Sequence, residues 1–228
     1  MRLYIDSALS DDWEKWAKRG VLYGATTNPL IFKSQGVDLT KRTVFRMIDK
    51  AKDIGLKSLQ LQVHGLNQPK EAAKQMSRYF DRWPDGVVGK VPLTVEGLGV
   101  LPLLPKAMPI TLTAAFDARQ ALLAASHEAR YIAPYYGRLK EAGGDADAVV
   151  DAMLKICQGK TRVLVASLRS VEQIVALAKR GHDTFTIAPS IFEAFMEVPQ
   201  SQQATAEFEA AATMLKLDAN NKGGFFKP

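Results

Sequence analysis

Short apolar runs alternate with longer amphipathic stretches along most of the chain. The runs are rich in Val, Ile, Leu and Tyr, which is typical of strands buried on both faces. Strands are predicted at Arg2–Asp6, Val21–Ala25, Leu59–Val63, Val87–Val91, Ile110–Ala114, Tyr131–Ala133, Arg162–Ala166 and Thr184–Ile187. Helices are predicted at Asp11–Arg19, Leu39–Asp53, Gln68–Arg82, Phe116–Glu128, Asp145–Gln158, Val171–Arg180 and Ile191–Glu197, with another at Val95–Leu104 that Pro102 and Pro105 interrupt or end.

This alternation predicts an α/β fold with a parallel sheet and helical crossovers. Eight β/α pairs favour a closed barrel over an open sheet, and 228 residues lie near the compact end of the size range for such barrels. We therefore expect one domain over residues 1–228, a single (β/α)8 TIM barrel with an extra C-terminal helix. That helix is predicted at 201–217, followed by a flexible polar tail at 218–228.

Composition narrows the class of protein. Hydrophobic residues make up 47% of the chain and charged residues 24%, which excludes intrinsic disorder. The lone cysteine, Cys157, excludes an intrachain disulfide and fits a reducing compartment. No apolar stretch of about 18 residues predicts a membrane span, and Asp6 comes too early for a signal peptide. A cytoplasmic protein without a membrane partner is expected.

Charge and histidine placement limit the possible partners. Thirty basic and 24 acidic residues give a net charge of +6, which admits nucleic acid or an anionic small molecule. The basic residues are scattered rather than clustered, so we expect no nucleic-acid partner. His64, His127 and His182 lie in separate units without ligand spacing, and no glycine-rich cofactor motif is present. Neither a metal nor another cofactor is predicted.

Polar residues gather where the predicted strands end. Chemistry in a (β/α)8 barrel is located at this carboxyl-terminal edge, so these residues predict a polar site there. They are Asp6 on the first strand, Thr26 and Asn28 after the second, Gln62 on the third, Lys90 on the fourth, Thr111 and Thr113 on the fifth, Tyr135 and Arg138 after the sixth, and Ser167 and Arg169 after the seventh.

Lys90 is the most informative of these residues. A lysine inside an apolar strand is costly to bury unless it is paired. Burial favours the neutral amine, which an imine-forming nucleophile requires. The alternative is a structural lysine that reaches the barrel mouth or pairs with Asp6 or Glu96. Asp6 could likewise move protons beside an imine, or it could cap the following helix.

Two loops have a binding and a structural interpretation. Thr26-Thr27-Asn28-Pro29 could contact a ligand or could be a simple turn, with proline fixing the backbone. Arg138, Ser167 and Arg169 predict an anion site, because arginine pairs with phosphate and the next helix N-terminus attracts negative charge. Ordinary loop polarity is the alternative for these three residues.

Five motifs resemble one enzyme family. They are Leu3-Tyr4-Ile5-Asp6, Gly24-Ala25-Thr26-Thr27-Asn28-Pro29, Gly89-Lys90-Val91-Pro92-Leu93-Thr94, Ile132-Ala133-Pro134-Tyr135 and Ala166-Ser167-Leu168-Arg169. In this order and at strand ends, they make the chain from Leu3 to about Pro199 resemble the transaldolase family, in particular its short branch that includes the fructose-6-phosphate aldolases. The resemblance implies a (β/α)8 barrel with a Schiff-base lysine on strand four, where Lys90 falls.

The resemblance also implies roles for the other residues. Lys90 would attack the keto carbon of a ketose, and Asp6 would act as acid and base at the hydroxyl whose deprotonation breaks the carbon–carbon bond. Asn28 would bind substrate hydroxyls, and Thr26 would help to hold the site. Gln62, Thr113 and Tyr135 would position a water that shuttles protons, while Arg138, Ser167 and Arg169 would hold the phosphate of a sugar phosphate.

The subtype depends on a few positions. Transaldolases usually carry Glu in place of Gln62 and Phe in place of Tyr135, whereas the aldolase branch carries Gln and Tyr, as here. Tyr136-Gly137-Arg138 and Ser167-Leu168-Arg169 nevertheless resemble the transaldolase phosphate clamp. Thr111 matches neither branch and is expected to face the donor hydroxyls.

The predicted activity is cleavage or transfer of a dihydroxyacetone unit from a substrate of the fructose 6-phosphate type. One alternative is a transaldolase proper, acting on sedoheptulose 7-phosphate and glyceraldehyde 3-phosphate. Others are a different barrel lyase that uses Lys90, for example on a deoxysugar phosphate, and a non-catalytic sugar-phosphate-binding barrel.

Gln202–Leu217 carries apolar residues at helical spacing, including Phe208, Met214 and Leu215. The predicted barrel is complete before this helix, so the stripe must cover its own barrel or a neighbouring copy. The family resemblance favours a homo-oligomer formed through the C-terminal helix.

Overall fold

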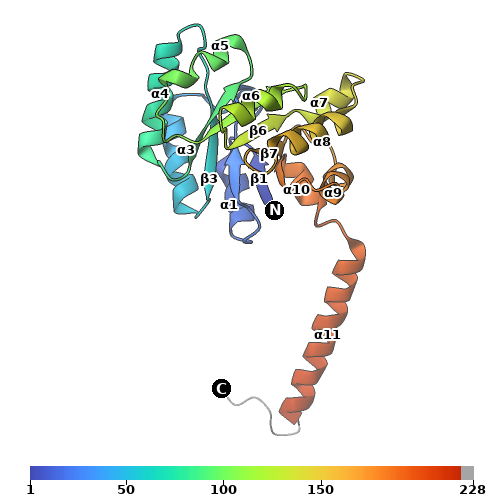
Figure 1. Ribbon diagram of the computed structural model, residues 1–228. Coiled ribbons are helices and arrows are strands. Elements are labelled where there is room, and N and C mark those ends of the chain that lie inside the picture. The colour runs from blue at the N-terminus through green and yellow to red at the C-terminus, as the bar shows by residue number, and fades with distance from the viewer. Residues whose placement is uncertain (222–228) are drawn as a thin grey trace. The chain divides into compact units, whose positions relative to one another are not determined.

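The computed structural model describes the backbone of residues 1–221 and the side chains of residues 1–216. It divides into two compact units, the first being Met1–Phe192 and the second beginning at Glu193. In the first unit, eight parallel strands pair in chain order and the last pairs with the first (Figure 1). The predicted (β/α)8 barrel is therefore confirmed. None of the described helices is long and apolar enough to cross a membrane.

All eight predicted strands form. They are β1 Arg2–Asp6, β2 Gly24–Thr26, β3 Ser58–Gln62, β4 Val87–Pro92, β5 Ile110–Ala115, β6 Tyr131–Pro134, β7 Arg162–Val165 and β8 Thr184–Ile187. Only β2 is clearly displaced, because it begins at Gly24 rather than at Val21. A Cβ on Gly24 would lie 2.2 Å from the Ser58 carbonyl oxygen, so a residue without a side chain permits this close approach to β3.

The helices of the barrel follow the strands (Figure 1). They are α1 Ser10–Ala17, α2 Pro29–Ser34, α3 Lys41–Asp53, α4 Pro69–Arg82, α5 Val95–Leu98, α6 Gln120–Ser126, α7 Tyr136–Glu141, α8 Ala146–Cys157, α9 Val171–Lys179 and α10 Pro189–Ala194. The predicted helix at Val95–Leu104 ends early, at Leu98, and continues as the 3-10 turn Leu101–Leu103 (η1), since Pro102 has no N–H for the helical hydrogen-bond pattern.

The sequence did not predict α2 and α7, which are too short to show helical periodicity. Helix α2 starts where Asn28 Oδ1 accepts hydrogen bonds from Leu30 N at 2.9 Å and Ile31 N at 3.0 Å. Pro29 occupies the first helical turn, where its missing N–H costs nothing. The turn interpretation of Thr26-Thr27-Asn28-Pro29 is therefore replaced by a capped helix that begins directly after β2.

The strand register brings three of the predicted site residues onto neighbouring strands. Gln62 pairs with Lys90 across β3 and β4, and Lys90 pairs with Thr111 across β4 and β5. Buried Tyr4, Val88, Tyr131, Ala133 and Leu164 form one hydrophobic cluster. Because side chains alternate in direction along a strand, Gln62, Lys90 and Val88 share one face of the sheet.

The second unit contains helix α11, Pro199–Asn221. It begins two residues before the predicted start at 201 and extends beyond the predicted end at 217, so residues 218–221 of the predicted flexible tail are helical. The remainder of that tail, 222–228, lies outside the described residues. Phe208, Met214 and Leu215 of the predicted apolar stripe are 71%, 68% and 69% exposed.

Candidate active site

A cavity of about 250 Å³ opens at the carboxyl-terminal ends of the strands, where the predicted site residues were expected to meet. Seven of those residues line it. The lining comprises the predicted residues Asp6, Asn28, Lys90, Tyr135, Arg138, Ser167 and Arg169, together with Leu30, Ile31, Ser34, Ala166 and Thr186. Thr26, Gln62, Thr111 and Thr113 are not part of the lining, although their strands border the same mouth.

Lys90 is buried in β4 with only 4% of its surface exposed. Its Nζ donates a hydrogen bond to the Thr27 carbonyl oxygen at 3.1 Å. Among the residues with described side chains, Lys90 forms no ion pair with Asp6 or Glu96, the two partners considered for a structural lysine. A buried amine with one neutral acceptor and an open cavity beside it matches the environment that a nucleophilic amine needs.

Asp6 ends β1 beside this amine. Its Oδ1 accepts a hydrogen bond of 2.6 Å from Thr26 Oγ1, which also bonds to Thr186 Oγ1. Burial raises the pKa of Asp6, and the nearby Lys90 ammonium and the Thr26 hydrogen bond offset only part of that effect. Helix α1 has no side-chain cap, so the alternative capping role of Asp6 is wrong. The carboxyl group is thus positioned to exchange a proton within the cavity.

Asn28 contributes to both the helix and the cavity. Its Oδ1 caps α2, which fixes the orientation of the side-chain amide. The Asn28 Nδ2 group makes no hydrogen bond to any residue with a described side chain, and Asn28 lines the Lys90 cavity. The capping interaction therefore leaves two N–H donors available to a hydroxyl of a bound molecule.

Three predicted residues surround the mouth beside Lys90. Thr113 Oγ1 donates to Tyr135 Oη over 3.4 Å, a long hydrogen bond. Gln62 Oε1 is buried without a hydrogen-bond partner in the described structure. The register shifts between Thr113 and Ala115, and Ala114 has a φ of +58°, so a bulge redirects the end of β5 here. A loosely held hydroxyl pair and an unpaired amide oxygen are the acceptors and donors that an ordered water needs.

Thr111 lies in a different environment. Its side chain is fully buried, and its Oγ1 donates to Gln60 Oε1 at 2.8 Å. It is absent from the lining of the Lys90 cavity. The Thr111 hydroxyl is therefore engaged within the barrel and does not face the cavity in this structure.

Arg138, Ser167 and Arg169 meet at one edge of the cavity. Ser167 has a φ of +63°, and a Cβ on Gly137 would lie 2.0 Å from the Ser167 carbonyl oxygen, so glycine alone allows α7 to approach this loop. Arg169 Nε donates to Glu141 Oε1 at 2.8 Å. This edge presents two guanidinium groups and a hydroxyl, the donor set that suits a phosphate.

Sequence reasoning missed three residues that support the site. Thr27 acts through its carbonyl oxygen, which its side chain does not reveal. Thr186 lines the cavity and forms a hydrogen bond with Thr26. The sequence could have indicated it, because it is a polar residue within the buried strand β8. Glu141 orients Arg169, and the hydrogen bond from Arg169 lowers the pKa of Glu141, but the two residues are far apart in sequence.

Metal ligands do not cluster at this mouth. Within the described residues, no group of three or more His, Cys, Asp or Glu side chains could hold a metal ion. The groups that the mouth offers to a bound molecule are the amine, carboxyl, hydroxyl and guanidinium groups described above.

Comparison with solved structures indicates the fold. The putative copper homeostasis protein CutC from Streptococcus agalactiae superposes with a TM-score of 0.64 at 11% identity, covering 83% of this chain and 98% of its own. A variant of the citrate synthase SbnG gives a TM-score of 0.58 at 12% identity, covering 92% of this chain and 95% of its own. At such low identity these similarities support the barrel fold alone.

Sequence comparisons are more specific. A probable transaldolase from Nitrosopumilus maritimus is 30% identical over 214 residues, covering 91% of this chain and 93% of the relative. A probable transaldolase from Dehalococcoides mccartyi is also 30% identical over 214 residues, covering 92% and 97%. The model of the transaldolase/fructose-6-phosphate aldolase family matches residues 3–223. With this match across nearly the whole chain, the protein belongs to the transaldolase/fructose-6-phosphate aldolase family.

Proposed function

We propose that this protein is a Schiff-base aldolase or transaldolase that acts on ketose phosphates, with Lys90 as its nucleophile. The observation that carries the proposal is the buried Lys90 amine, which faces a polar cavity beside the Asp6 carboxyl group. Family membership supports the same reaction class. No cofactor is needed, because the imine itself withdraws the electrons of the bond that breaks.

The proposed reaction begins with attack of the Lys90 amine on the substrate keto carbon. Loss of one water gives a protonated imine. Asp6 then accepts the proton of the hydroxyl next to the scissile bond, the carbon–carbon bond breaks, and an aldehyde leaves. The bond's electron pair moves into an enamine on Lys90. Addition of a proton or of an acceptor aldehyde to this enamine, followed by hydrolysis, returns the free amine.

Borohydride trapping tests the nucleophile. Reduction in the presence of fructose 6-phosphate should add covalent mass to the wild-type chain, and peptide mapping should place it on Lys90. Lys90→Met is the matched control and should gain no mass. An unmodified wild-type chain would contradict the imine and favour a non-catalytic sugar-phosphate-binding barrel. A lyase for deoxysugar phosphates would instead trap such a sugar and ignore fructose 6-phosphate.

The fate of the enamine sets the subtype. Thr113 and Tyr135 are linked at 3.4 Å, and the Gln62 oxygen lacks a partner in the described structure, so these groups can hold water beside Lys90 without adding the negative charge of a glutamate. The phenol of Tyr135 can donate a proton to the enamine. We therefore propose cleavage of fructose 6-phosphate to dihydroxyacetone and glyceraldehyde 3-phosphate with no acceptor present.

A side-by-side assay separates this activity from that of a transaldolase proper. Release of dihydroxyacetone from fructose 6-phosphate alone supports the aldolase. Efficient transfer to erythrose 4-phosphate without release supports the alternative, which the Arg138, Ser167 and Arg169 edge and the names of the relatives favour. Tyr135→Phe should shift the partition toward transfer.

Two further proposals accompany this function. The exposed apolar residues of α11, Phe208, Met214 and Leu215, support a homo-oligomer formed through that helix. Light scattering of the full chain and of a chain ending at Pro199 tests this, and a monomeric full-length protein would contradict it. We also propose a cytoplasmic location, because the single Cys157 requires no oxidising compartment.

A further inference from the structure

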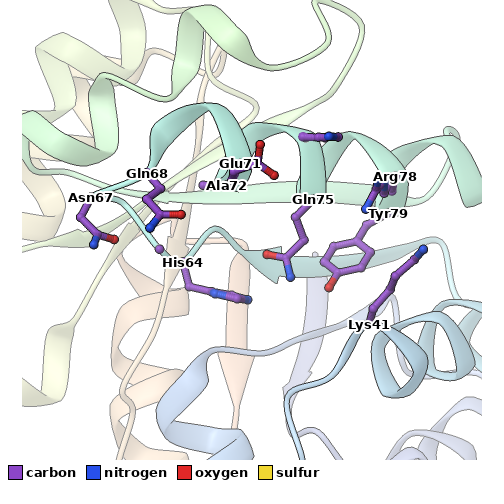
Figure 2. Close-up of a pocket in the computed structure, with 11 residues that line it drawn as sticks. Lys41, His64, Asn67, Gln68, Glu71, Ala72, Gln75, Arg78 and Tyr79 are labelled. Atoms are coloured by element: carbon purple, nitrogen blue, oxygen red, sulfur yellow. The ribbon is translucent and has the colours of Figure 1, made fainter.

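A second cavity lies outside the barrel, between α4, the start of α3 and the loop that follows β3. Its volume is about 460 Å³, larger than the cavity at Lys90. In Figure 2 the side chains of Gln75 and Tyr79 extend from α4 toward His64, and the side chain of Lys41 rises beside Tyr79. This volume is within the range of pockets that hold small molecules. None of its lining residues lines the Lys90 cavity, so it is a separate site.

The charge of this α3–α4 cavity is positive. Lys41, Lys74 and Arg78 line it, while Glu71 is the single carboxylate among its described lining residues. None of the three cations forms an ion pair with any residue whose side chain is described. Unpaired cations around a concave surface attract an anionic ligand.

Two buried polar groups in the wall lack partners of good hydrogen-bond geometry. Tyr79 is 3% exposed, and its Oη has no such partner in the described structure. The Nε2 atom of His64 is also buried and unpartnered. Buried polar atoms are nearly always satisfied, because an unmade hydrogen bond is costly. Both groups belong to the cavity lining, so a bound polar molecule would satisfy them.

The protonation states suit an anion. Burial raises the pKa of Tyr79, and the neighbouring Gln75 side chain offsets only part of that rise, so the phenol remains a hydrogen-bond donor at neutral pH. Burial lowers the pKa of His64, so the imidazole is neutral and offers one N–H donor. Two neutral donors in the wall and three cations around them form a complementary set for a multiply charged oxyanion.

We propose that the α3–α4 cavity binds a phosphorylated small molecule, held by Lys41, Lys74 and Arg78 through charge and by Tyr79 and His64 through hydrogen bonds. A phosphate group fits the donor set, and the volume leaves room for the organic part of a phosphate ester. This binding site does not depend on the proposed chemistry at Lys90.

The site has a physical connection to the catalytic mouth. A small cavity between the two is lined by Asn28, Gln62, His64 and Tyr79, among other residues. His64 and Tyr79 therefore line both the α3–α4 cavity and this small cavity, which Asn28 and Gln62 also line.

Histidine-detected NMR tests the site without an activity assay. The chain has three histidines, His64, His127 and His182, so each can be followed separately. Addition of inorganic phosphate should shift the His64 ring signals in a saturable manner and leave those of His127 and His182 unchanged. Glycerol 3-phosphate should give the same pattern at lower concentration if the site takes an ester. If inorganic phosphate bound more tightly than glycerol 3-phosphate, the proposal of a phosphate ester would be overturned and the free ion would be the ligand.

Matched variants make the test specific. Arg78→Ala should weaken phosphate binding about tenfold, the effect of one lost charge-assisted hydrogen bond. Lys70→Ala removes a cation from the same helix outside the cavity and should leave binding unchanged. Tyr79→Phe should also weaken binding while the fold remains intact. Arg169→Ala should preserve the His64 response, which separates it from binding at the catalytic mouth.

Three further results would overturn the proposal. These are no saturable His64 shift with either probe, equal losses in Arg78→Ala and Lys70→Ala, and loss of the His64 response in Arg169→Ala. The last result would mean that phosphate at the catalytic mouth causes the shift. Because no arm measures turnover, the outcome is independent of whether Lys90 forms an imine.

Discussion

Both ends of the barrel interior carry polar residues, but these residues differ in how fully they are hydrogen-bonded. At the amino-terminal end, Arg2 Nη1 donates to Tyr131 Oη at 2.6 Å, and that oxygen lies 2.8 Å from Tyr4 Oη. At the carboxyl-terminal end, the buried Lys90 amine has one backbone acceptor, and Gln62 Oε1 has no partner in the described structure. Polar groups that bind one another stabilise a barrel, whereas polar groups left partly unpaired are available to a substrate.

The pKa directions reflect different neighbours at the two ends. Burial raises the pKa of Tyr4, and the neighbouring Tyr131 phenol raises it further, so the Tyr4 phenol keeps its proton. Burial also raises the pKa of Asp6, but the Lys90 ammonium acts in the opposite direction. The Tyr4 phenol is held by other phenols, whereas the Asp6 carboxyl group lies near an amine. Stability at one end and chemistry at the other can therefore be tested separately.

Lys90→Met should have the largest effect at the catalytic end. Turnover should fall by more than about a hundredfold, because no other side chain replaces the nucleophile. The circular dichroism spectrum should be retained, since methionine fills a similar volume in β4. Retention of more than about a hundredth of wild-type turnover would exclude Lys90 as the nucleophile.

Arg169→Ala should have the next largest effect, confined to phosphorylated substrates. Their binding should weaken by about 1.5–3 kcal/mol, the scale of a hydrogen bond to a charged group, while dihydroxyacetone should be affected much less. The measurement is kcat/KM for both substrates, with Arg119→Ala as the control for loss of an exposed arginine. Equal losses for the two substrates would show that Arg169 is structural.

Tyr131→Phe should act only at the stabilising end. It removes the acceptor of Arg2 and the partner of Tyr4, so the free energy of unfolding should fall by about 1–2 kcal/mol with kcat unchanged. Chemical denaturation measures this change. Tyr79→Phe is the matched control, because its buried hydroxyl lacks a well-formed hydrogen bond in the described structure and stability should stay the same or rise slightly. A loss of kcat in Tyr131→Phe would mean that the two ends are coupled.

The smallest effect concerns the pH dependence of stability at Asp6. The raised pKa means that the folded state binds the Asp6 proton more tightly than the unfolded state, whose Asp6 pKa is near 3.8. Its contribution to stability is therefore present below that pH and is lost as the pH rises through the folded-state value. Asp6→Asn should remove this loss. The free energy of unfolding of the variant, relative to that of the wild type, should therefore increase as the pH rises from about 3.8 through the folded-state pKa of Asp6. Urea unfolding at a series of pH values measures the difference, and a constant difference would contradict the raised pKa.

The sequence predicted the strands much better than the short helices. A buried parallel strand such as β8 is recognisable from its own apolar residues, because both of its faces are covered. Helix α2 depends on a cap by Asn28 and on Pro29, which in sequence are equally consistent with a turn. The later start of α6 has a similar cause, since Gln120 Oε1 accepts hydrogen bonds from Phe116 N and Asp117 N and holds them outside the helix.

The sequence alone determined which residues are present at each strand end, because the alternation of strands and helices along the chain can be recognised from local patterns. Lys90 and Asp6 were found in this way, as were Gln62 and Tyr135, the two residues on which the predicted subtype depends. Tertiary structure alone decided which of the polar groups are free. The Gln60 side-chain oxygen accepts a hydrogen bond from Thr111 Oγ1, whereas the side-chain oxygen of Gln62, two residues later on the same strand, has no partner in the described structure. Likewise, the α3–α4 cavity exists only because the start of α3 at Lys41, the loop at His64, and Arg78 and Tyr79 of α4 meet in space. Hydrogen-bond partners and cavities depend on which surfaces meet in space, and no local pattern along the chain records them.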